Sequence, residues 1–173
     1  MRKIDLKQFD EVYTFFQQAF IPAELRDYDE MKMLFEKGLF VIYGEYEDDY
    51  LLAAMIVWEL EHCVYLENFA VSEKARGKGI GSFVLKEFTR LYKDCFLFME
   101  VEVPYDSISR RRIQFYEKNG YLSNRYTYIQ PPFRKDDEPV HLTFMTYPSC
   151  MNEEQFHDIK EEIFKVVYQR GKI

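Results

Sequence analysis

Residues that bind metals or form disulfides are scarce in this sequence. It has three cysteines and three histidines in 173 residues, and no CxxC pair. An odd number of isolated cysteines argues against a disulfide framework and a zinc site. His62 and Cys63 are neighbours in an expected strand, so their side chains point to opposite faces and cannot share one ion. We therefore expect neither a disulfide nor a bound metal.

Long apolar runs are also missing. The longest covers the eight residues 51–58, whereas a membrane-spanning helix needs about 20. The N-terminal segment MRKIDLKQFDEV is too charged for a signal peptide. We therefore expect a soluble, cytoplasmic protein without a membrane partner.

Basic residues are outnumbered by acidic ones, 23 against 30, which gives a net charge of −7. Binding to a polyanion needs a cationic surface, so we expect no nucleic-acid partner. A cationic partner, such as an amine or a basic peptide, fits this charge better.

Apolar and aromatic residues are plentiful, at 47% and 18% of the chain. This composition excludes disorder, and the length suits one domain that needs no disulfide or metal for stability. So many rings indicate a densely packed core, a cleft lined by aromatic side chains, or both.

The first half of the chain alternates between helical and strand patterns. A short edge strand at 1–5 precedes helices at 7–20 and 27–37, and strands follow at 39–46, 50–59 and 62–71. The short turns between these strands, the first of them the acidic segment 47–49, favour an antiparallel meander.

The second half begins with a polar, glycine-rich segment at 72–81. The pattern then predicts helix 82–92, strand 95–103, helix 108–118, strands 121–129 and 140–147, and a final helix at 151–170. The crossover through helix 82–92 predicts that strands 62–71 and 95–103 are parallel neighbours. The final helix either packs on the sheet or reaches a second copy of the chain, so a homodimer stays open.

The most informative segment runs from Arg76 to Gly81, RGKGIG, between an expected strand and an expected helix. Glycines let the backbone approach a ligand and direct N–H groups at it, and the helix N-terminus adds positive potential. Lys74, Arg76 and Lys78 add mobile positive charge. We therefore predict a site for a pyrophosphate or a similar anion.

Several interpretations of this loop compete. The P-loop pattern is absent, and the dinucleotide fingerprint fails because Ser82 stands at its third glycine. The pattern R/Q-x-x-G-x-G/A is matched by Arg76, Gly79 and Gly81. A flexible surface turn is the remaining alternative.

Two motifs together resemble the GNAT N-acetyltransferase superfamily. The segment 64–71, VYLENFAV, leading into RGKGIG resembles its acetyl-CoA motif, and the segment 113–121, IQFYEKNGY, resembles its second motif. The resemblance covers roughly residues 1–147. It implies an α+β fold with a mixed, mostly antiparallel sheet of about seven strands flanked by helices, to which this chain adds a C-terminal helix.

The resemblance implies acetyl-CoA as cofactor and assigns residues to it. The loop would bind the CoA pyrophosphate, and the end of the preceding strand would pair with the pantetheine arm. An asparagine that many members carry is replaced here by Ser109, which could contact the cofactor or cap its helix. The implied residues are Phe69, Ala70, Val71, Arg76, Gly77, Lys78, Gly79, Ile80, Gly81 and Ser109.

Catalytic candidates follow from the same resemblance. Tyr116 matches the frequent general acid, since a phenol stays protonated at neutral pH and can protonate a leaving thiolate. For the general base we slightly favour Glu67, whose strand is otherwise apolar, over Glu100; a water chain is the alternative. Together with Glu102 these carboxylates would attract a cation.

The resulting hypothesis is an acetyl-CoA-dependent N-acetyltransferase that acts on a primary amine of a small molecule or a peptide. A non-catalytic acyl-CoA-binding sensor on the same scaffold is the alternative, and a nucleotide-binding oxidoreductase is disfavoured. We expect the segments 21–28 and 130–139 to determine the acceptor.

Overall fold

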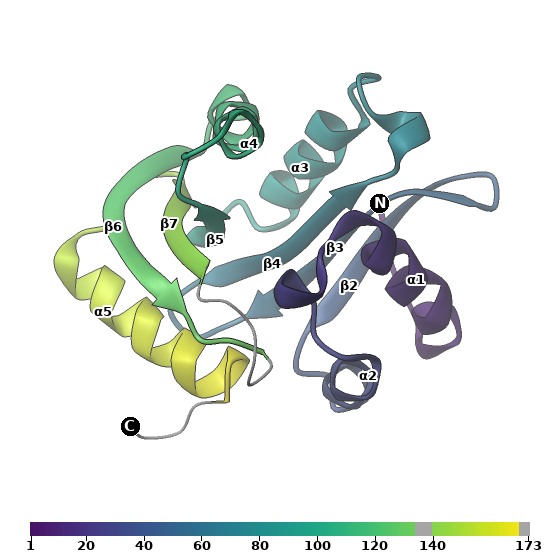
Figure 1. Cartoon of the computed structure of the whole chain (residues 1–173), viewed down its shortest axis with the longest axis horizontal. Helices are drawn as coiled ribbons and strands as arrows, with labels where there is room; N and C mark the ends of the chain where they lie inside the picture. Colours follow the sequence, from purple (N-terminus) through teal and green to yellow (C-terminus); the bar gives the residue numbers. More distant parts are fainter. Residues whose placement is uncertain (134–139, 170–173) are drawn as a thin grey trace. The chain divides into compact units, whose positions relative to one another are not determined.

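The computed structural model describes residues 1–133 and 140–169. Its strands are β1 (Arg2–Lys3), β2 (Val41–Glu47), β3 (Tyr50–Glu59), β4 (Val64–Val71), β5 (Leu97–Glu102), β6 (Leu122–Gln130) and β7 (Val140–Tyr147). Its α-helices are α1 (Phe9–Ala19), α2 (Tyr28–Glu36), α3 (Ile80–Leu91), α4 (Ser107–Lys118) and α5 (Glu153–Glu162). The strands follow the order β1-β2-β3-β4-β5-β7-β6 in a seven-stranded, mostly antiparallel sheet, which confirms the predicted fold class (Figure 1).

The chain divides into two compact units, and we describe each by itself. The first contains residues 1–59 and 66–91, and the second contains residues 60–65 and 92–173. β4 belongs to both, because its first two residues, Val64 and Tyr65, fall in the second unit.

The first unit is built on an antiparallel meander whose most buried strand is β3. The eight residues from Leu51 to Trp58 are all buried, which is typical of a strand covered on both faces. The helices α1 and α3 both contact β3. The longest apolar run of the sequence is therefore a core strand, with the predicted bounds.

The helices of the first unit end one residue before the predicted positions. α1 buries its stripe of Phe9, Val12 and Phe16 and stops at Ala19, shortly before Pro22. α3 begins at Ile80, two residues earlier than predicted, so Ile80 and Gly81 form its first turn. The glycine loop therefore runs directly into the helix.

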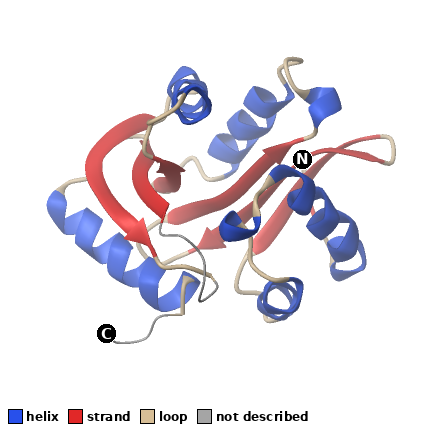
Figure 2. Cartoon of the chain, in the orientation of Figure 1, coloured by secondary structure: helices blue, strands red, loops and turns tan. Residues whose placement is uncertain are grey.

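In the second unit β7 lies between β5 and β6, and all three strands pair antiparallel. β6 and β7 curve strongly, and α5 runs along β6 (Figures 1 and 2). Ring contacts fix this packing: Tyr126 stacks on Phe156 at 4.6 Å between centroids, and Tyr128 meets Phe164 edge-on at 5.3 Å. Of the two predicted alternatives, the final helix thus packs on its own sheet.

The final helix departs from the prediction at its start, which is Glu153 instead of residue 151, and in its last turns. A π-turn at Ile163–Val167 follows α5, and residue 170, where we predicted the end, lies outside the described residues.

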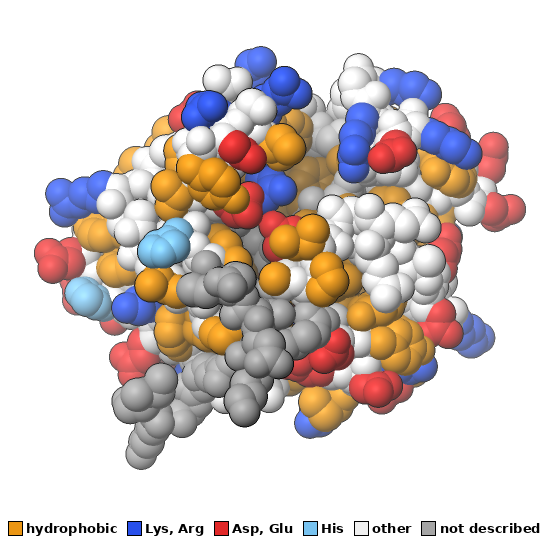
Figure 3. Space-filling view, in the orientation of Figure 1, with side chains coloured by type: hydrophobic (Ala, Val, Ile, Leu, Met, Phe, Trp, Pro, Cys, Tyr) orange, Lys and Arg blue, Asp and Glu red, His pale blue; other side chains and the backbone are white. Residues whose placement is uncertain are grey.

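No helix of the described segments is long and apolar enough to cross a membrane. Charged side chains of both signs are interspersed over the face shown in Figure 3.

Candidate functional site

The glycine loop connects β4 to α3 within the first unit. After β4 ends at Val71, a short 3₁₀ turn at Glu73–Ala75 leads into the loop. Gly77 and Gly79 have φ values of +75° and +82°, a left-handed conformation that favours glycine. No atom lies within 4 Å of a Cβ added at either position, so the space above both glycines is open. The backbone conformation, rather than crowding, requires glycine here.

The loop lies beside a hollow lined by side chains of both charges. The Arg76 Nε donates to the Val71 carbonyl at 3.3 Å and closes the turn, while the Lys74 ammonium lies 5.0 Å from the centre of the Tyr50 ring. A hollow of about 670 Å³ separates the acidic β2–β3 turn from the two lysines of this region; it is lined by Glu47, Asp48, Asp49, Tyr50, Leu52, Lys74, Ala75, Lys78 and Ile80. The loop side of this hollow therefore carries two lysines, and the opposite side carries the three acidic residues of the β2–β3 turn.

Glu67 is a buried ion-pair partner on β4. Its Oε1 accepts from Arg26 Nη2 at 2.9 Å, and its Oε2 accepts from Trp58 Nε1 at 2.7 Å. The side chains of Arg26 and Glu67 are only 4% and 6% exposed. Both carboxylate oxygens are therefore engaged by strong donors, one of them permanently charged.

The same ion pair holds the segment between α1 and α2. The Tyr13 hydroxyl donates to the Arg26 carbonyl at 3.1 Å, and the Asn68 side chain donates to the Glu24 carbonyl at 3.3 Å. This segment is part of the predicted acceptor region 21–28. It is held by two side chains of β4, Glu67 and Asn68. Sequence reasoning missed Arg26, because nothing local pairs it with Glu67.

Ser109 closes a capping box at the start of α4. Its hydroxyl donates to Asp106 Oδ1 at 2.6 Å, and the Asp106 N–H donates back to the Ser109 hydroxyl at 3.2 Å. The hydrogen bonds from Ser109 lower the pKa of Asp106. Of the two roles expected for Ser109, capping the helix is therefore observed, and the cofactor role stays a prediction.

Tyr116 lies on α4 in the second unit with 8% of its surface exposed. Its ring packs against Phe115 and Tyr121, with centroids 5.3 and 6.2 Å away. Burial raises the pKa of Tyr116 to about 12, while the charge of Arg112 acts in the opposite direction. The phenol is therefore protonated at every ordinary pH.

Glu100, on β5, is the centre of a phenol cluster. Its Oε2 accepts from the hydroxyls of Tyr65 at 2.8 Å and Tyr168 at 2.7 Å. The sequence placed Glu100 beside Glu102 on one strand face but gave no sign of either tyrosine. Glu102 itself forms an ion pair with Arg112 at 3.7 Å.

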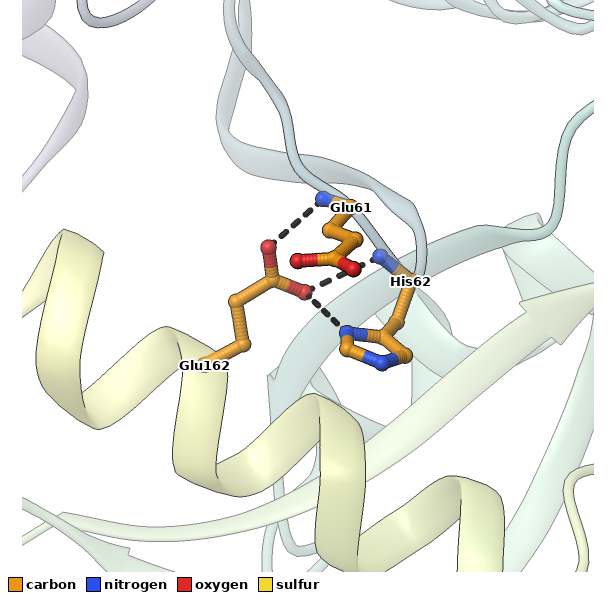
Figure 4. Close-up of side chains that lie close together, drawn as sticks. All are labelled: Glu61, His62 and Glu162. Carbon is orange, nitrogen blue, oxygen red and sulfur yellow. Dashed lines mark hydrogen bonds and ion pairs between the residues drawn. The ribbon is translucent and has the colours of Figure 1, made fainter.

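One group of potential metal ligands forms within the described residues: Glu61, His62 and Glu162 (Figure 4). The Glu162 carboxylate accepts from the backbone N–H groups of Glu61 and His62 at 2.6 and 3.0 Å, and from His62 Nδ1 at 2.9 Å. The hydrogen bond with Glu162 raises the pKa of His62. Donors already surround this carboxylate, so the group links α5 to the turn before β4; the absence of a metal stays a prediction.

The candidate residues thus fall into two sets, each described in its own unit. Glu67, Phe69, Ala70, Val71 and the loop 76–81 lie in the first, on β4 and the start of α3. Glu100, Ser109 and Tyr116 lie in the second, on β5 and α4.

A family model matches most of the chain. The model for the acetyltransferase (GNAT) family matches residues 7–121, which is more than half of the chain. The chain therefore belongs to this family and is an acetyltransferase, as the two motifs predicted. The match ends before β6, β7 and α5.

Solved structures share this fold over most of the chain. A Bacteroides thetaiotaomicron protein described as a GNAT-family acetyltransferase is 24% identical with a TM-score of 0.87, covering 96% of this chain and 97% of that one. A ribosomal-protein-alanine N-acetyltransferase of Brucella melitensis is 17% identical with a TM-score of 0.64, covering 86% and 98%. A mutant spermidine N-acetyltransferase of Vibrio cholerae is 11% identical with a TM-score of 0.62, covering 84% and 92%. The search of curated proteins gave no match.

Proposed function

We propose that this protein is a cytoplasmic N-acetyltransferase that transfers the acetyl group of acetyl-CoA directly to a primary amine in a ternary complex. The observation that carries the proposal is the loop between β4 and α3, where Gly77 and Gly79 adopt left-handed backbone conformations beneath open space. A Cβ at either position would extend into this open space, and in this proposal the space receives the pyrophosphate of CoA.

In this proposal the residues of the first unit bind the donor. The backbone of Arg76–Gly81 and the N-terminus of α3 would hold the pyrophosphate, helped by Lys74 and Lys78. Phe69, Ala70 and Val71, at the end of β4, would pair with the pantetheine arm. Acetyl-CoA supplies an activated thioester, and the protein supplies position and charge.

Tyr116 would assist the departure of the CoA sulfur. Full transfer of its proton, from a phenol with a pKa of about 12 to a thiolate whose parent thiol has a pKa of ~8.5, is uphill by about 5 kcal/mol. A hydrogen bond from the protonated phenol to the sulfur avoids this cost. We therefore assign Tyr116 the role of hydrogen-bond donor to the leaving group, with complete transfer following only as the amine gives up its own proton.

For the general base we now favour Glu100 over Glu67, the reverse of the slight preference drawn from the sequence. Glu67 already accepts from Arg26 and Trp58, so taking another proton would weaken a buried ion pair. Glu100 Oε2 accepts from two phenols, and such neutral donors compete less with a proton than a guanidinium does. We assign the role of general base to Glu100, which would act directly or through a water molecule. We assign to Glu67 the role of anchoring the segment 21–28.

The acceptor class rests on charge. A net charge of −7 and the Glu100 carboxylate on β5 favour a cationic amine, whereas Glu67 and Glu102 are paired with Arg26 and Arg112. The neighbours from Brucella melitensis and Vibrio cholerae are named for protein alanine and for spermidine, and both of these acceptors are amines.

The decisive experiment measures free-thiol release from acetyl-CoA with a panel of polyamines, aminoglycosides and peptides. We expect amine-dependent turnover that Gly79→Val abolishes, with loss of CoA binding by calorimetry. Gly38→Val, the same substitution at another left-handed glycine with open space around it, is the matched control for strain outside the loop. CoA binding without turnover on any amine would favour a sensor, and normal CoA binding by folded Gly79→Val would place the donor elsewhere.

A further inference from the structure

The C-terminal helix ends in a residue that contacts the proposed base. Tyr168 follows the π-turn after α5 and donates its hydroxyl to Glu100 Oε2 at 2.7 Å, across 68 residues of sequence. The residue is 9% exposed and lies outside the segment that the family model matches. We infer that Tyr168 is a positioning residue for Glu100 and that the appended helix completes the catalytic machinery; the inference rests on the proposed function.

The π-turn determines where Tyr168 points. The Tyr168 N–H donates to the Ile163 carbonyl at 3.0 Å, five residues back instead of four. One residue of an α-helix spans about 100°, so an uninterrupted α-helix would direct this side chain to another face. Such π-turns are frequent at functional sites.

Packing holds the turn in place. Ile159, Ile163 and Val167 are all buried, with at most 2% exposure, and they form one stripe of the helix. The Tyr168 ring adds contacts with Phe164 and Phe133, each at 5.8 Å between centroids. A rigid, well-packed element therefore positions the Tyr168 hydroxyl against Glu100. Precise placement of a base requires such support.

Two phenols on one carboxylate oxygen have a clear chemical effect. Each O–H donates to the ionised form, which favours that form and fixes the direction of the carboxylate. The second oxygen of the same group then has a defined orientation from which to accept a proton. Tyr168 would thus influence the rate of the reaction and its pH dependence without touching the substrate.

Tyr168→Phe tests this inference, and the chain supplies a matched control. Tyr128 lies in the same aromatic cluster against Phe164, and its buried hydroxyl has no hydrogen-bond partner among the described residues. Tyr128→Phe therefore removes an equivalent hydroxyl without removing a bond to Glu100. Glu100→Gln completes the set.

The first readout does not depend on activity. In protein labelled with ¹³C at the glutamate carboxyls, the Glu100 signal is identified by its loss in Glu100→Gln. We expect its titration midpoint to move to higher pH in Tyr168→Phe and to stay unchanged in Tyr128→Phe. An unchanged midpoint in Tyr168→Phe overturns the inference, whatever the enzyme acetylates.

The second readout is kinetic. We expect Tyr168→Phe to lower kcat about tenfold, the value of one hydrogen bond to a charged group, to move the acidic limb of its pH profile upward, and to leave both KM values unchanged. In the Glu100→Gln background the same change should have no further effect. If Glu100→Gln lowers kcat but Tyr168→Phe does not, the inference alone fails; if Glu100→Gln keeps full kcat, the proposed base is wrong and the inference falls with it.

Discussion

Burial of single polar groups determines much of the chemistry of this protein. Cys63 is buried, and burial together with the charges of Glu162 and Glu100 raises the pKa of its thiol well above the usual value. Such a thiol is a poor nucleophile, because the thiolate is the reactive form. Cys63 is therefore a core residue, although it stands next to the exposed His62.

Tyr116 allows a direct test of the same effect. The pKa of the Tyr116 phenol is about 12 in the folded protein and ~10 in an unfolded chain. Between these two pH values only the unfolded chain loses the proton. The stabilising contribution is complete below pH 10 and is lost as the pH rises to about 12. Relative to Tyr116→Phe, we expect wild type to lose roughly 1–2 kcal/mol of unfolding free energy between pH 9 and pH 11.

Urea denaturation of both proteins at the two pH values measures this difference. The comparison removes the contribution of other groups that titrate in alkali, because the two proteins share them. An identical pH dependence in both proteins would mean that the Tyr116 hydroxyl is hydrated.

At the scale of elements, Ser109 at the start of α4 has a structural role, which is to cap the helix. The sequence alone does not distinguish this role from contact with the cofactor. The Ser109 side chain is 1% exposed and is engaged with Asp106. Ser109→Ala removes half of a capping box, so we expect a loss of ~1 kcal/mol in stability. We expect CoA affinity to stay unchanged, because the hydroxyl is already used within the helix terminus.

Thermal unfolding and calorimetric CoA titration of Ser109→Ala measure the two effects. Asp106→Ala is the matched variant, and the double variant should cost less than the sum, because both changes remove one reciprocal pair. Weaker CoA binding by Ser109→Ala at unchanged stability would restore the cofactor role.

Local patterns predicted the elements well and their distant partners poorly. Strands 50–59 and 140–147 have the predicted bounds, because apolar β-branched and aromatic runs leave no helical alternative. The placement of β7 between β5 and β6 could not be predicted, since hairpin strands pair equally well on either side. The same holds for the site. The loop glycines could be recognised from the sequence. The pairs Arg26–Glu67 and Tyr65–Glu100 could not, because their members lie 41 and 35 residues apart.

At the scale of the whole molecule, charge is the property most open to measurement. The net charge is −7, and on the face drawn in Figure 3 acidic and basic side chains are interspersed. Attraction of a cationic acceptor would therefore combine the field of the net negative charge with the carboxylate of the proposed base, Glu100. Both contributions are screened by salt, over ~8 Å at physiological ionic strength.

We therefore expect the apparent KM of the best acceptor to rise severalfold between 20 and 500 mM salt, with kcat nearly constant, because screening weakens encounter rather than chemistry. The measurement is thiol release at saturating acetyl-CoA across a salt series, with sucrose replacing salt as a control for viscosity. An arylamine that is uncharged at neutral pH is the matched acceptor, and its KM should hardly change. A best acceptor that is neutral or anionic, or a cationic one whose KM ignores salt, would show that shape and hydrogen bonding rather than charge select the substrate.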